Sequence, residues 1–189
     1  MIICTSFTLS FIQHGNLLIC SLIQFCPQKN DKIRWSAPNF FLFDKVVQCI
    51  PGDGRCLFRS VTHGACFRAG KPYPSESLQK NLADELRAKV VNEFIKRRAE
   101  TEWILEGDFD EYVMQMRQPH IWGGEPELLM SSHVLQMPIT VYMKDKTSGS
   151  LKIIAEYGKE YGKEDPVCVL YHGYGHYDAL HRLEARIRW

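Results

Sequence analysis

The hydrophobic pattern is clearest over residues 76–98, where it predicts a long amphipathic helix. Apolar side chains recur there at every fourth position, in the series Leu78, Leu82, Leu86, Val90 and Phe94. One apolar residue per turn forms a stripe that can pack against a core. Ser75 or Ser77 can cap the start of this helix. We interpret its charged residues as solvated faces, and they are Lys80, Glu85, Arg87, Lys89, Glu93 and Lys96.

A strand, a tight turn and a helix are predicted in succession over residues 45–68. Residues 45–50 are apolar and β-branched, as in a short strand. The turn follows at Gly52-Asp53-Gly54, because glycine adopts backbone angles that other residues avoid and Asp bonds to nearby backbone N–H groups. Residues 57–68 can be helical. The turn therefore places Cys56 at or near the first turn of a helix.

The later part of the chain predicts two more helices and then several strands. Asp108 can cap a short helix over residues 111–116, and a loop at 122–124 leads into a helix over 125–135. Strands are expected over 139–143, 151–156, 167–171 and 176–180. Helices followed by strands, with one strand before the cysteine, favour an α+β fold in which helices pack against a mixed sheet.

The charge balance and the cysteines narrow the classes of function. The chain has 189 residues, with 23 Lys and Arg against 22 Asp and Glu, and a formal net charge of +1. A nucleic-acid partner usually requires a basic excess, so we expect none. The seven cysteines include no C-x-x-C pair, which disfavours both a closed zinc site and a disulfide-stapled secreted scaffold. A reducing compartment, and hence the cytoplasm, fits this composition better.

The two ends of the chain differ from the middle. Residues 1–28 contain no Asp, Glu, Lys or Arg, but they lack the basic start and the cleavage site of a signal peptide. Polar residues interrupt the apolar run, so no stable membrane span is expected. We interpret 1–44 as a poorly ordered extension that ends in a linker over 28–44, although its apolar start leaves organelle or membrane targeting open. Residues 182–189 are interpreted as a basic tail.

Cys56 has the setting of a nucleophile. The free N–H groups and the dipole of a helix start favour negative charge, which stabilises a thiolate. His176 and Asp178 are two apart in a predicted strand, so their side chains share one face and the carboxylate can orient the imidazole. His176 lies 120 residues after Cys56 (176 − 56), so only the fold can bring them together. A nucleophile, a base and an orienting group form the arrangement of a cysteine hydrolase.

Each of these residues also has a purely structural interpretation. Cys56 could be a buried cysteine after a turn, His176 a half-buried strand residue and Asp178 a surface carboxylate at a strand end. For Asp53, the role of a simple turn residue is the stronger alternative. Its functional role would be to shape a loop whose N–H groups meet a developing oxyanion.

A metal site is the rival chemistry. His172 and His176 are four residues apart, as on a zinc-binding helix, and His181 follows them. Gly173 and Gly175 lie between the first two, however, and the surroundings are strand-like. We therefore expect no metal site and no organic cofactor.

Three motifs together resemble the ovarian tumour (OTU) domain cysteine peptidases, and most closely their plant members. The motifs are Pro-Gly-Asp-Gly-Arg-Cys-Leu-Phe-Arg-Ser at 51–60, Trp-Gly-Gly-Glu-Pro-Glu-Leu at 122–128 and Gly-His-Tyr-Asp-Ala-Leu at 175–180. The first and the last are specific as a pair, and the resemblance covers roughly residues 46–180. It implies a papain-like OTU fold of the α+β class, with a small mixed β-sheet packed between helices, and a catalytic domain over 45–181.

The resemblance also implies a catalytic apparatus. Cys56 matches the nucleophile, His176 the general base, Asp178 the residue that orients this base, and Asp53 the acidic residue of the cysteine loop. The implied function is that of a cysteine-dependent deubiquitinase, which cuts after the C-terminal glycine of ubiquitin in ubiquitin or polyubiquitin chains. A catalytically silent ubiquitin-binding module is the alternative, and a monomer is expected. The expected substrate contacts are Gly54, Arg55, Trp122, Gly123 and Gly124.

Overall fold

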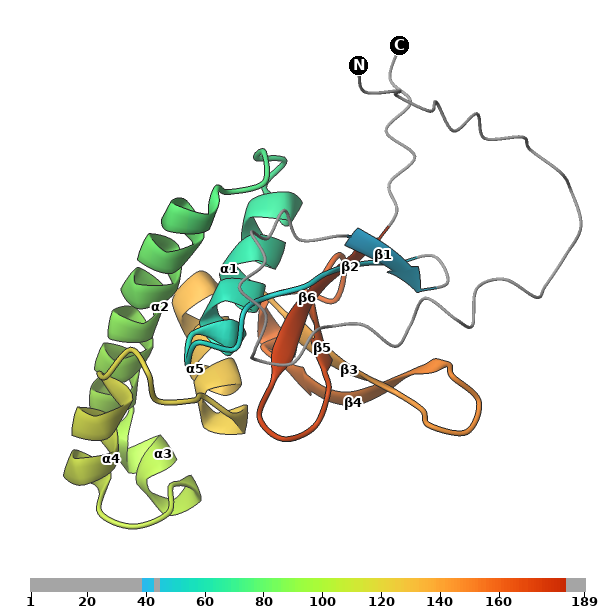
Figure 1. Ribbon diagram of the computed structural model, residues 1–189. Helices are drawn as coiled ribbons and strands as arrows, with labels where there is room; N and C mark the ends of the chain where they lie inside the picture. The colour runs from blue at the N-terminus through green and yellow to red at the C-terminus, as the bar shows by residue number, and fades with distance from the viewer. Residues whose placement is uncertain (1–38, 43–44, 183–189) are drawn as a thin grey trace, which may run out of the picture. The chain divides into compact units, whose positions relative to one another are not determined.

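A computed structural model describes residues 39–42 and 45–182, which form five α-helices and one six-stranded sheet (Figure 1). The helices are α1 (Cys56–Arg68), α2 (Glu76–Lys96), α3 (Arg98–Thr101), α4 (Phe109–Met116) and α5 (Glu125–Leu135). Short 3₁₀ helices are η1 (Glu102–Ile104) and η2 (Lys159–Tyr161). The strands are β1 (Asn39–Leu42), β2 (Lys45–Gln48), β3 (Ile139–Lys144), β4 (Leu151–Tyr157), β5 (Val167–Tyr171) and β6 (Tyr177–Arg182). The predicted α+β class is confirmed.

The sheet is mixed, and its strand order is β1-β2-β6-β5-β3-β4. Neighbouring strands are antiparallel except for β3 and β5, which are parallel. The register of β5 with β6 places Leu170 opposite Asp178. On the other side of β6, Val47 of β2 lies opposite Leu180. The segment that leaves β2 towards Cys56 is therefore tied to the strand that carries Asp178.

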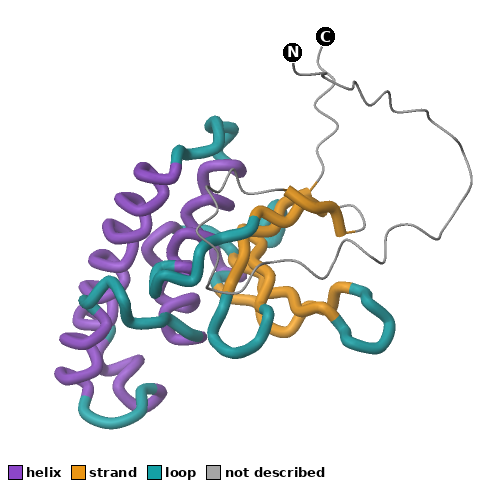
Figure 2. The backbone as a smooth tube through the Cα atoms, in the orientation of Figure 1, coloured by secondary structure: helices purple, strands orange, loops and turns teal. Residues whose placement is uncertain are grey.

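Helix α1 joins the sheet to the other helices. It contacts β5 and β6 on one side and α2 on the other, and α2 also contacts α4 and α5. Figure 2 shows the strands gathered together and the helices beside them. The side chains of Phe58, Val61, Val90 and Val169 meet in this core and are 0% exposed. Full burial of a side chain of this size is worth about 1.5–3 kcal/mol, so the start of α1 is held firmly.

Helix α2 forms as predicted, but its predicted apolar and charged faces are only partly right. Ser75 caps it, since its Oγ accepts the N–H of Leu78 at 3.4 Å. Leu78, near the start of the helix, is 46% exposed, whereas Leu86, Val90 and Phe94 are at most 3% exposed, so the apolar stripe belongs to the core only from Leu86 onward. The interpretation of Arg87 as a solvated residue is wrong, because it is 2% exposed. Backbone carbonyls satisfy its buried guanidinium, as described below.

The remaining helices follow the prediction closely. Helix α4 begins after Asp108, whose Oδ1 accepts the N–H of Glu111 at 2.9 Å. Helix α5 spans the predicted residues 125–135 and begins after Gly124. It ends at Gln136, which has a left-handed conformation (φ 53°), just before Pro138. Local capping signals were therefore sufficient to place these helices.

The last strand begins later than predicted. His176 was expected in a strand, but β6 starts at Tyr177, and the N–H of His176 donates to the carbonyl of Gly173 at 3.2 Å. Gly173, Tyr174 and Gly175 all have positive φ, which ends the pairing of β5 with β6 before His176. His176 therefore lies in the β5–β6 turn, and the strand extends past the predicted residue 180 to Arg182.

Strand β1 was not predicted. It lies in the stretch interpreted as a linker, and it pairs antiparallel with β2, from Asn39 opposite Gln48 to Leu42 opposite Lys45. The rest of the predicted extension and linker (1–38 and 43–44) and most of the predicted tail (183–189) lie outside the described residues. Within the described part, none of the helices combines the length and the apolar character needed to cross a membrane.

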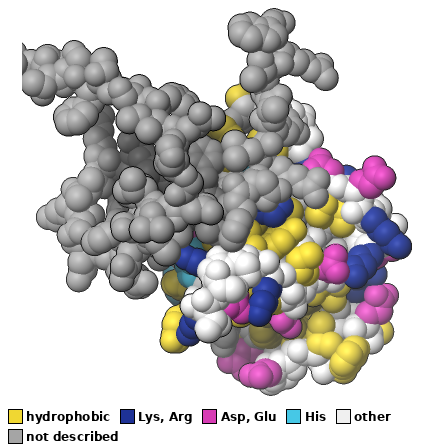
Figure 3. Space-filling view, turned by 90° about the vertical axis from the view of Figure 1, so that its right-hand side faces the viewer, with side chains coloured by type: hydrophobic (Ala, Val, Ile, Leu, Met, Phe, Trp, Pro, Cys, Tyr) yellow, Lys and Arg dark blue, Asp and Glu magenta, His cyan; other side chains and the backbone are white. Residues whose placement is uncertain are grey.

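The surface carries both signs of charge. On the face that Figure 3 shows, acidic and basic side chains lie side by side with apolar side chains between them. The acidic run around α4 is likewise partly balanced, since Asp110 pairs with Arg98 at 3.1 Å and Arg98 also pairs with Glu102 at 3.1 Å. Exposed ion pairs of this kind contribute little to stability because water screens them, and they describe a hydrated surface.

Candidate active site

Cys56 is the first residue of α1, as the sequence predicted. The first intrahelical bond runs from the N–H of Arg59 to the carbonyl of Arg55 at 2.8 Å, so the N–H groups of residues 56–58 precede it. The side chain is 1% exposed, and its thiol lies 3.7 Å from the carbonyl oxygen of Gly175 in the β5–β6 turn. A thiolate at this position faces the positive end of the helix dipole.

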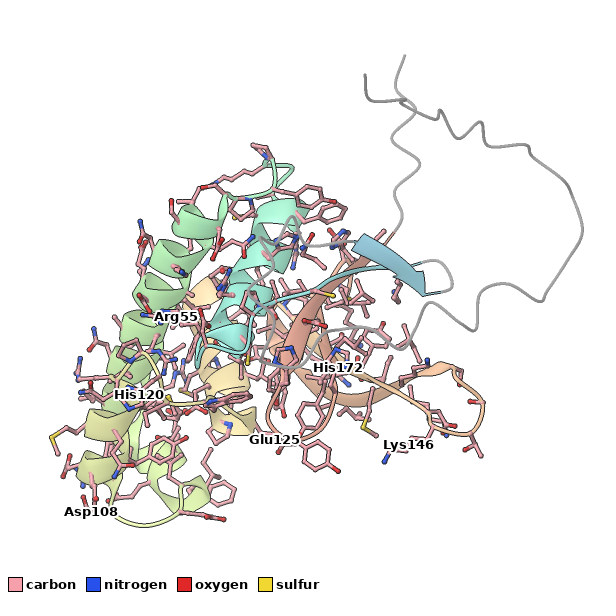
Figure 4. All side chains as sticks on the ribbon, viewed as in Figure 1. Arg55, Asp108, His120, Glu125, Lys146 and His172 are labelled. Atoms are coloured by element: carbon pink, nitrogen blue, oxygen red, sulfur yellow. The ribbon has the colours of Figure 1, made fainter. Side chains whose placement is uncertain are left out.

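Gly54 lets two loops touch beside Cys56. Its φ is +84°, and a Cβ built there would lie 2.5 Å from the backbone of His120. Figure 4 labels His120 on the loop that joins α4 to α5. Only glycine satisfies both the backbone angle and the close approach. The cysteine loop (residues 51–56) is therefore fixed against the loop over residues 117–124.

Asp53 shapes the cysteine loop from within. Its Oδ1 accepts the N–H of Arg55 at 3.1 Å, and its Oδ2 pairs with Nη1 of Arg59 at 3.0 Å. Arg59 is 1% exposed, and its Nη2 also donates to Gln79 at 3.1 Å. The carboxylate thus closes the turn and ties it to α1 and α2. It occupies the N–H of Arg55, which is then not a free donor for an oxyanion.

Two of the expected substrate contacts, Gly54 and Arg55, bind other parts of the protein. Arg55, labelled in Figure 4, donates from Nε and Nη2 to the two oxygens of Asp84, at 2.7 and 3.1 Å. Gly54 is buried, and its carbonyl accepts Nη2 of Arg87 at 2.7 Å. The bidentate pair of Arg55 with Asp84 fixes the Arg55 side chain on α2. In the structure both residues hold the cysteine loop in place.

His176 and Asp178 meet Cys56 from the β5–β6 turn and from β6. Nε2 of His176 lies 3.3 Å from Oδ1 of Asp178, which leaves Nδ1 for the thiol. Asp178 is 0% exposed, and its Oδ1 also accepts the N–H of Ile50 at 2.7 Å. The fold thus brings together three groups that the sequence predicted to meet, a thiol, an imidazole and a carboxylate.

The charge of this group differs from the simple picture of a neutral base. Burial lowers the pKa of His176, but hydrogen bonds with Asp178 and Cys56 and the negative charge of both outweigh that effect and raise it to about 10. Burial raises the pKa of Asp178, but hydrogen bonds from His172, His176 and the Ile50 N–H hold it below its usual range. His176 therefore carries a proton at neutral pH, and it can pair with a Cys56 thiolate before substrate arrives.

Trp122 lies beside the imidazole. Its ring centroid is 6.4 Å from that of His176, and its side chain is 40% exposed. A Cβ on Gly175 would lie 3.1 Å from Cε3 of Trp122, and one on Gly52 would lie 3.7 Å from both Trp122 and His176. Glycines on both sides therefore leave room for the indole to form one wall of the site.

Gly123 and Gly124 continue this wall and are held by a buried acid. The N–H of Gly124 donates to Oε2 of Glu127 at 2.7 Å, and the hydroxyl of Tyr112 donates to Oε1 at 2.6 Å. Glu127 is 1% exposed, and burial raises its pKa. A Cβ on Gly123 would lie 3.3 Å from Leu57 and from Glu127. The loop thus passes close to α1 because it has no side chain there.

A groove of about 250 Å³ runs along this wall. Gly123, Gly124 and Gly175, which neighbour Trp122 and His176 in the sequence, line part of it, and so does Glu125, labelled in Figure 4. The rest is lined mainly by apolar and aromatic residues of β3, β4, β5, β6 and α5, which are Leu128, Val141, Ile154, Ala155, Tyr157, Tyr171 and Tyr177. The groove can therefore take an extended peptide segment with small residues at the end near Cys56.

Arg87 is the main residue of the site that our sequence interpretation missed. Its guanidinium donates to the carbonyls of Gly54 (2.7 Å), Met116 (3.1 Å), Pro119 (3.3 Å) and Ile121 (2.9 Å). It also stacks on Phe58, 4.4 Å from the ring centroid. One buried cation thereby holds the cysteine loop and the Trp122 loop together. The spacing 83, 87, 90, 94 of the buried residues in α2 was the signal, since it places Arg87 in phase with the core.

His172 is the second residue that we missed, since we had considered it only as a ligand of the rival metal site. Its Nε2 lies 2.7 Å from Oδ2 of Asp178. His181, by contrast, lies in β6, with its Nε2 3.1 Å from the hydroxyl of Tyr73. The three histidines of the proposed metal site therefore do not converge. Among the described residues, no group of three or more His, Cys, Asp or Glu side chains is arranged to hold a metal ion.

Comparison with known protein families finds relatives of this chain. The family model of the OTU-like cysteine proteases matches residues 51–181. The OVARIAN TUMOR DOMAIN-containing deubiquitinating enzyme 4 of Arabidopsis thaliana is 69% identical over 146 residues, which cover 76% of this chain and 46% of that protein. The chain thus spans about half the length of this relative, and the predicted similarity to plant members is confirmed.

Solved structures agree on the fold. The OTU domain of OTUD1 superposes with a TM-score of 0.58 at 26% identity, covering 72% of this chain and 85% of that one. The Hazara virus OTU bound to ubiquitin gives a TM-score of 0.59 at 26% identity, covering 78% of this chain and 88% of that one. The sheet and the helices therefore belong to a known architecture.

Proposed function

The chain belongs to the OTU-like cysteine protease family, and from this premise we propose that it is a thiol-dependent deubiquitinase. The observation that carries the proposal is the meeting of Cys56, at a helix start, with an imidazole whose other nitrogen faces a buried carboxylate. A relative that is 69% identical is named a deubiquitinating enzyme, and the Hazara virus OTU was solved with ubiquitin bound. These properties of similar proteins support the same substrate here.

The first chemical step is acyl transfer to Cys56. The thiolate attacks the carbonyl carbon of ubiquitin's terminal glycine, and the C–N bond to the substrate amine breaks as the tetrahedral intermediate collapses. His176, protonated at neutral pH, gives its proton to the leaving amine. Asp178 stabilises the imidazolium and fixes its orientation through Nε2. The product of this step is a thioester between ubiquitin and Cys56.

Hydrolysis of the thioester completes the cycle. His176 is neutral after it has given up its proton, so it can take one from a water molecule that attacks the thioester carbonyl. The C–S bond breaks, ubiquitin leaves with a free carboxylate, and the thiolate–imidazolium pair is restored. The N–H of Cys56 precedes the first intrahelical bond of α1, so it is a candidate donor to the oxyanion in both steps.

The groove beside Trp122 fits the end of ubiquitin. Ubiquitin ends in a flexible tail with two terminal glycines. Because glycine has no side chain, these two residues fit a channel that is too narrow for residues with side chains. Gly123, Gly124 and Gly175 line the groove, and the Trp122 ring lies beside that of His176. Trp122, Gly123 and Gly124 are therefore assigned to substrate binding, while Gly54 and Arg55 position the cysteine loop.

The test is covalent capture of Cys56. We expect a ubiquitin probe with a C-terminal electrophile to modify the reduced protein at Cys56, and we expect the wild type to cleave ubiquitin dimers. Cys56→Ala should abolish both, and Cys66→Ala, which changes another thiol of α1, should change neither. A folded wild type without an adduct at Cys56 would reject the proposal. It would favour the alternative of a silent ubiquitin-binding module, which would bind ubiquitin equally with and without the thiol.

A further inference from the structure

The buried carboxylate of the site faces two imidazoles. Nε2 of His172 lies 2.7 Å from Oδ2 of Asp178, whereas Nε2 of His176 lies 3.3 Å from Oδ1. The shorter contact is therefore with the histidine that does not face Cys56. Asp178 is 0% exposed, so each of its oxygens needs a donor from the protein.

The β5–β6 hairpin explains why His172 reaches this position. His172 directly follows β5, and its N–H donates to the carbonyl of His176 at 3.0 Å across the turn. The two imidazole centroids are 5.6 Å apart. The register of Leu170 with Asp178 then places the carboxylate between the two rings. Figure 4 labels His172 beside these strands, and its side chain is 34% exposed.

The two oxygens of Asp178 have different donors. Oδ1 accepts the N–H of Ile50 at 2.7 Å and faces His176. For Oδ2, the contact within the described residues is with His172. Without that contact the carboxylate could rotate away from His176 or bind a proton, because a buried oxygen with no donor is costly. His172 is thus placed to hold the plane of the carboxylate from the side opposite to the reaction.

Resting on the proposed function, we propose that His172 is a positioning residue, which binds the second oxygen of Asp178 and thereby aligns that carboxylate with His176. His172 touches neither Cys56 nor the reacting carbonyl in this arrangement. Its effect on the reaction passes through Asp178 and then through His176.

This role has a signature in the pH dependence of the reaction. The titratable groups around Asp178 are His172 and His176 from the β5–β6 turn, and Cys56 from α1 acts on it through His176. The segment after β2 contributes only the N–H of Ile50. After the opposing effect of burial, the hydrogen bond from His172 is the largest cause that lowers the pKa of Asp178. Loss of His172 therefore raises that pKa, and activity is lost at a higher pH on the acid side.

The experiment compares His172→Phe, which keeps a ring but no donor, with His172→Gln, whose amide nitrogen can donate in place of Nε2. Ubiquitin hydrolysis is measured from pH 3 to pH 9 for both variants and the wild type, because the pKa of Asp178 lies below its usual range. We expect kcat of His172→Phe to fall about tenfold at neutral pH, the equivalent of one hydrogen bond to a charged group, with little change in KM. Its acid limb should move up by about one pH unit. The acid limb of the kcat profile of His172→Gln should coincide with that of the wild type.

A second measurement does not depend on ubiquitin. The rate at which iodoacetamide alkylates Cys56, followed by mass spectrometry of that peptide, reports the thiolate that His176 stabilises. The acid limb of the pH profile of this alkylation rate should shift in His172→Phe and not in His172→Gln. Equal unfolding midpoints of the two variants and the wild type are the control for folding. Superimposable profiles for wild type and His172→Phe would overturn the role of His172, even in an active enzyme. A shifted alkylation limb in a protein that fails to hydrolyse ubiquitin would reject the proposed function and retain this inference.

Discussion

Among the described residues, two pairs of histidines lie near the contact of α1 with β6, and the two pairs have opposite electrostatics. His172 and His176 lie at the Cys56 end of α1, on either side of Asp178. His63 and His181 lie further along the same contact, where their rings stack with centroids 5.7 Å apart. Histidine therefore meets two different environments, one in the β5–β6 turn and one between α1 and β6.

The first pair shares a negative charge. Asp178 is fully buried between the two rings, and the pKa of His176 rises to about 10 in spite of burial. The imidazole is consequently charged at neutral pH. The cost of placing a cation there is offset by the carboxylate and by the Cys56 thiolate.

The second pair shares only aromatic rings. His63 stacks on Tyr73 with centroids 5.1 Å apart, and His181 stacks on Phe67 at 4.4 Å. Neither ring nitrogen of His63 has a hydrogen-bond partner among the described residues. Burial and the nearby charge of His181 lower the pKa of His63 to about 4, and burial lowers the pKa of His181. These imidazoles are neutral, and they act as aromatic packing.

The difference shows that burial alone does not decide the charge of a histidine. Burial lowers the pKa at both ends of the α1–β6 contact, and the sign of the net shift depends on whether a carboxylate comes with it. The catalytic chemistry therefore depends on Asp178 as much as on His176. Mutations at either pair of histidines can test this difference.

The largest effect is expected when the carboxylate is removed from the first pair. Asp178→Asn keeps the shape but loses the charge, so the pKa of His176 should fall and the ring should lose its fixed tautomer. We expect kcat for ubiquitin cleavage to fall roughly a thousandfold. The matched control is Asp165→Asn, the same change at an exposed carboxylate with positive φ, where asparagine is well tolerated. Equal kcat for Asp178→Asn and wild type would mean that Asp178 does not support the imidazolium.

The second effect concerns stability at acid pH and belongs to the aromatic pair. The folded-state pKa of His63 lies below its unfolded value of 6.5, so its contribution to stability is complete above pH 6.5 and is lost as pH falls towards 4. Over this range the free energy of unfolding should drop by up to about 3 kcal/mol more in wild type than in His63→Phe. Urea unfolding at several pH values measures this difference.

His176 provides the internal contrast for that measurement. Its folded-state pKa is raised, so its contribution is complete below pH 6.5 and is lost as pH rises towards 10. His63→Phe should flatten the acid side of the stability profile and leave the alkaline side unchanged. Parallel profiles of the variant and the wild type on the acid side would contradict a neutral, buried His63.

The smallest effect is expected when a carboxylate is added to the second pair. The hydroxyl of Tyr73 lies 3.1 Å from Nε2 of His181, and Tyr73 is 53% exposed, so Tyr73→Glu can place an acid there without burying it. The pKa of His181 should rise by about one unit relative to Tyr73→Gln, which has a similar shape but no charge. Proton NMR titration of the His181 ring measures this shift. Identical titration in the two variants would show that the acid does not reach the ring.

Local signals in the sequence were sufficient for most of the secondary structure. Ser75, Asp108 and Gly124 mark the starts of α2, α4 and α5, because caps act on the next few residues only. The turn before α1 was equally readable, since Gly54 must have positive φ. The start of β6 was misplaced by one residue because alternation does not reveal where a turn with positive φ ends.

The residues that we misinterpreted are those whose partners lie far away in the chain. Arg87 looked like a surface residue because a charge on a helix usually is one, and its four carbonyl partners belong to residues 54, 116, 119 and 121. His181 was left outside the last predicted strand (176–180), although it lies in β6 and packs on His63 and Phe67 of α1. In both cases burial was decided by elements that the local pattern does not include.

The sequence by itself determined most of the order of helices and strands, the cysteine at a helix start and the family, because these depend on neighbours within a few residues or on short motifs. Only the tertiary structure decided which histidine carries a charge, which one fills a core and which arginine clamps two loops. Those properties depend on hydrogen bonds and electric fields between residues that are distant in the chain, and such partners meet only when the helices, the loops and the sheet pack together.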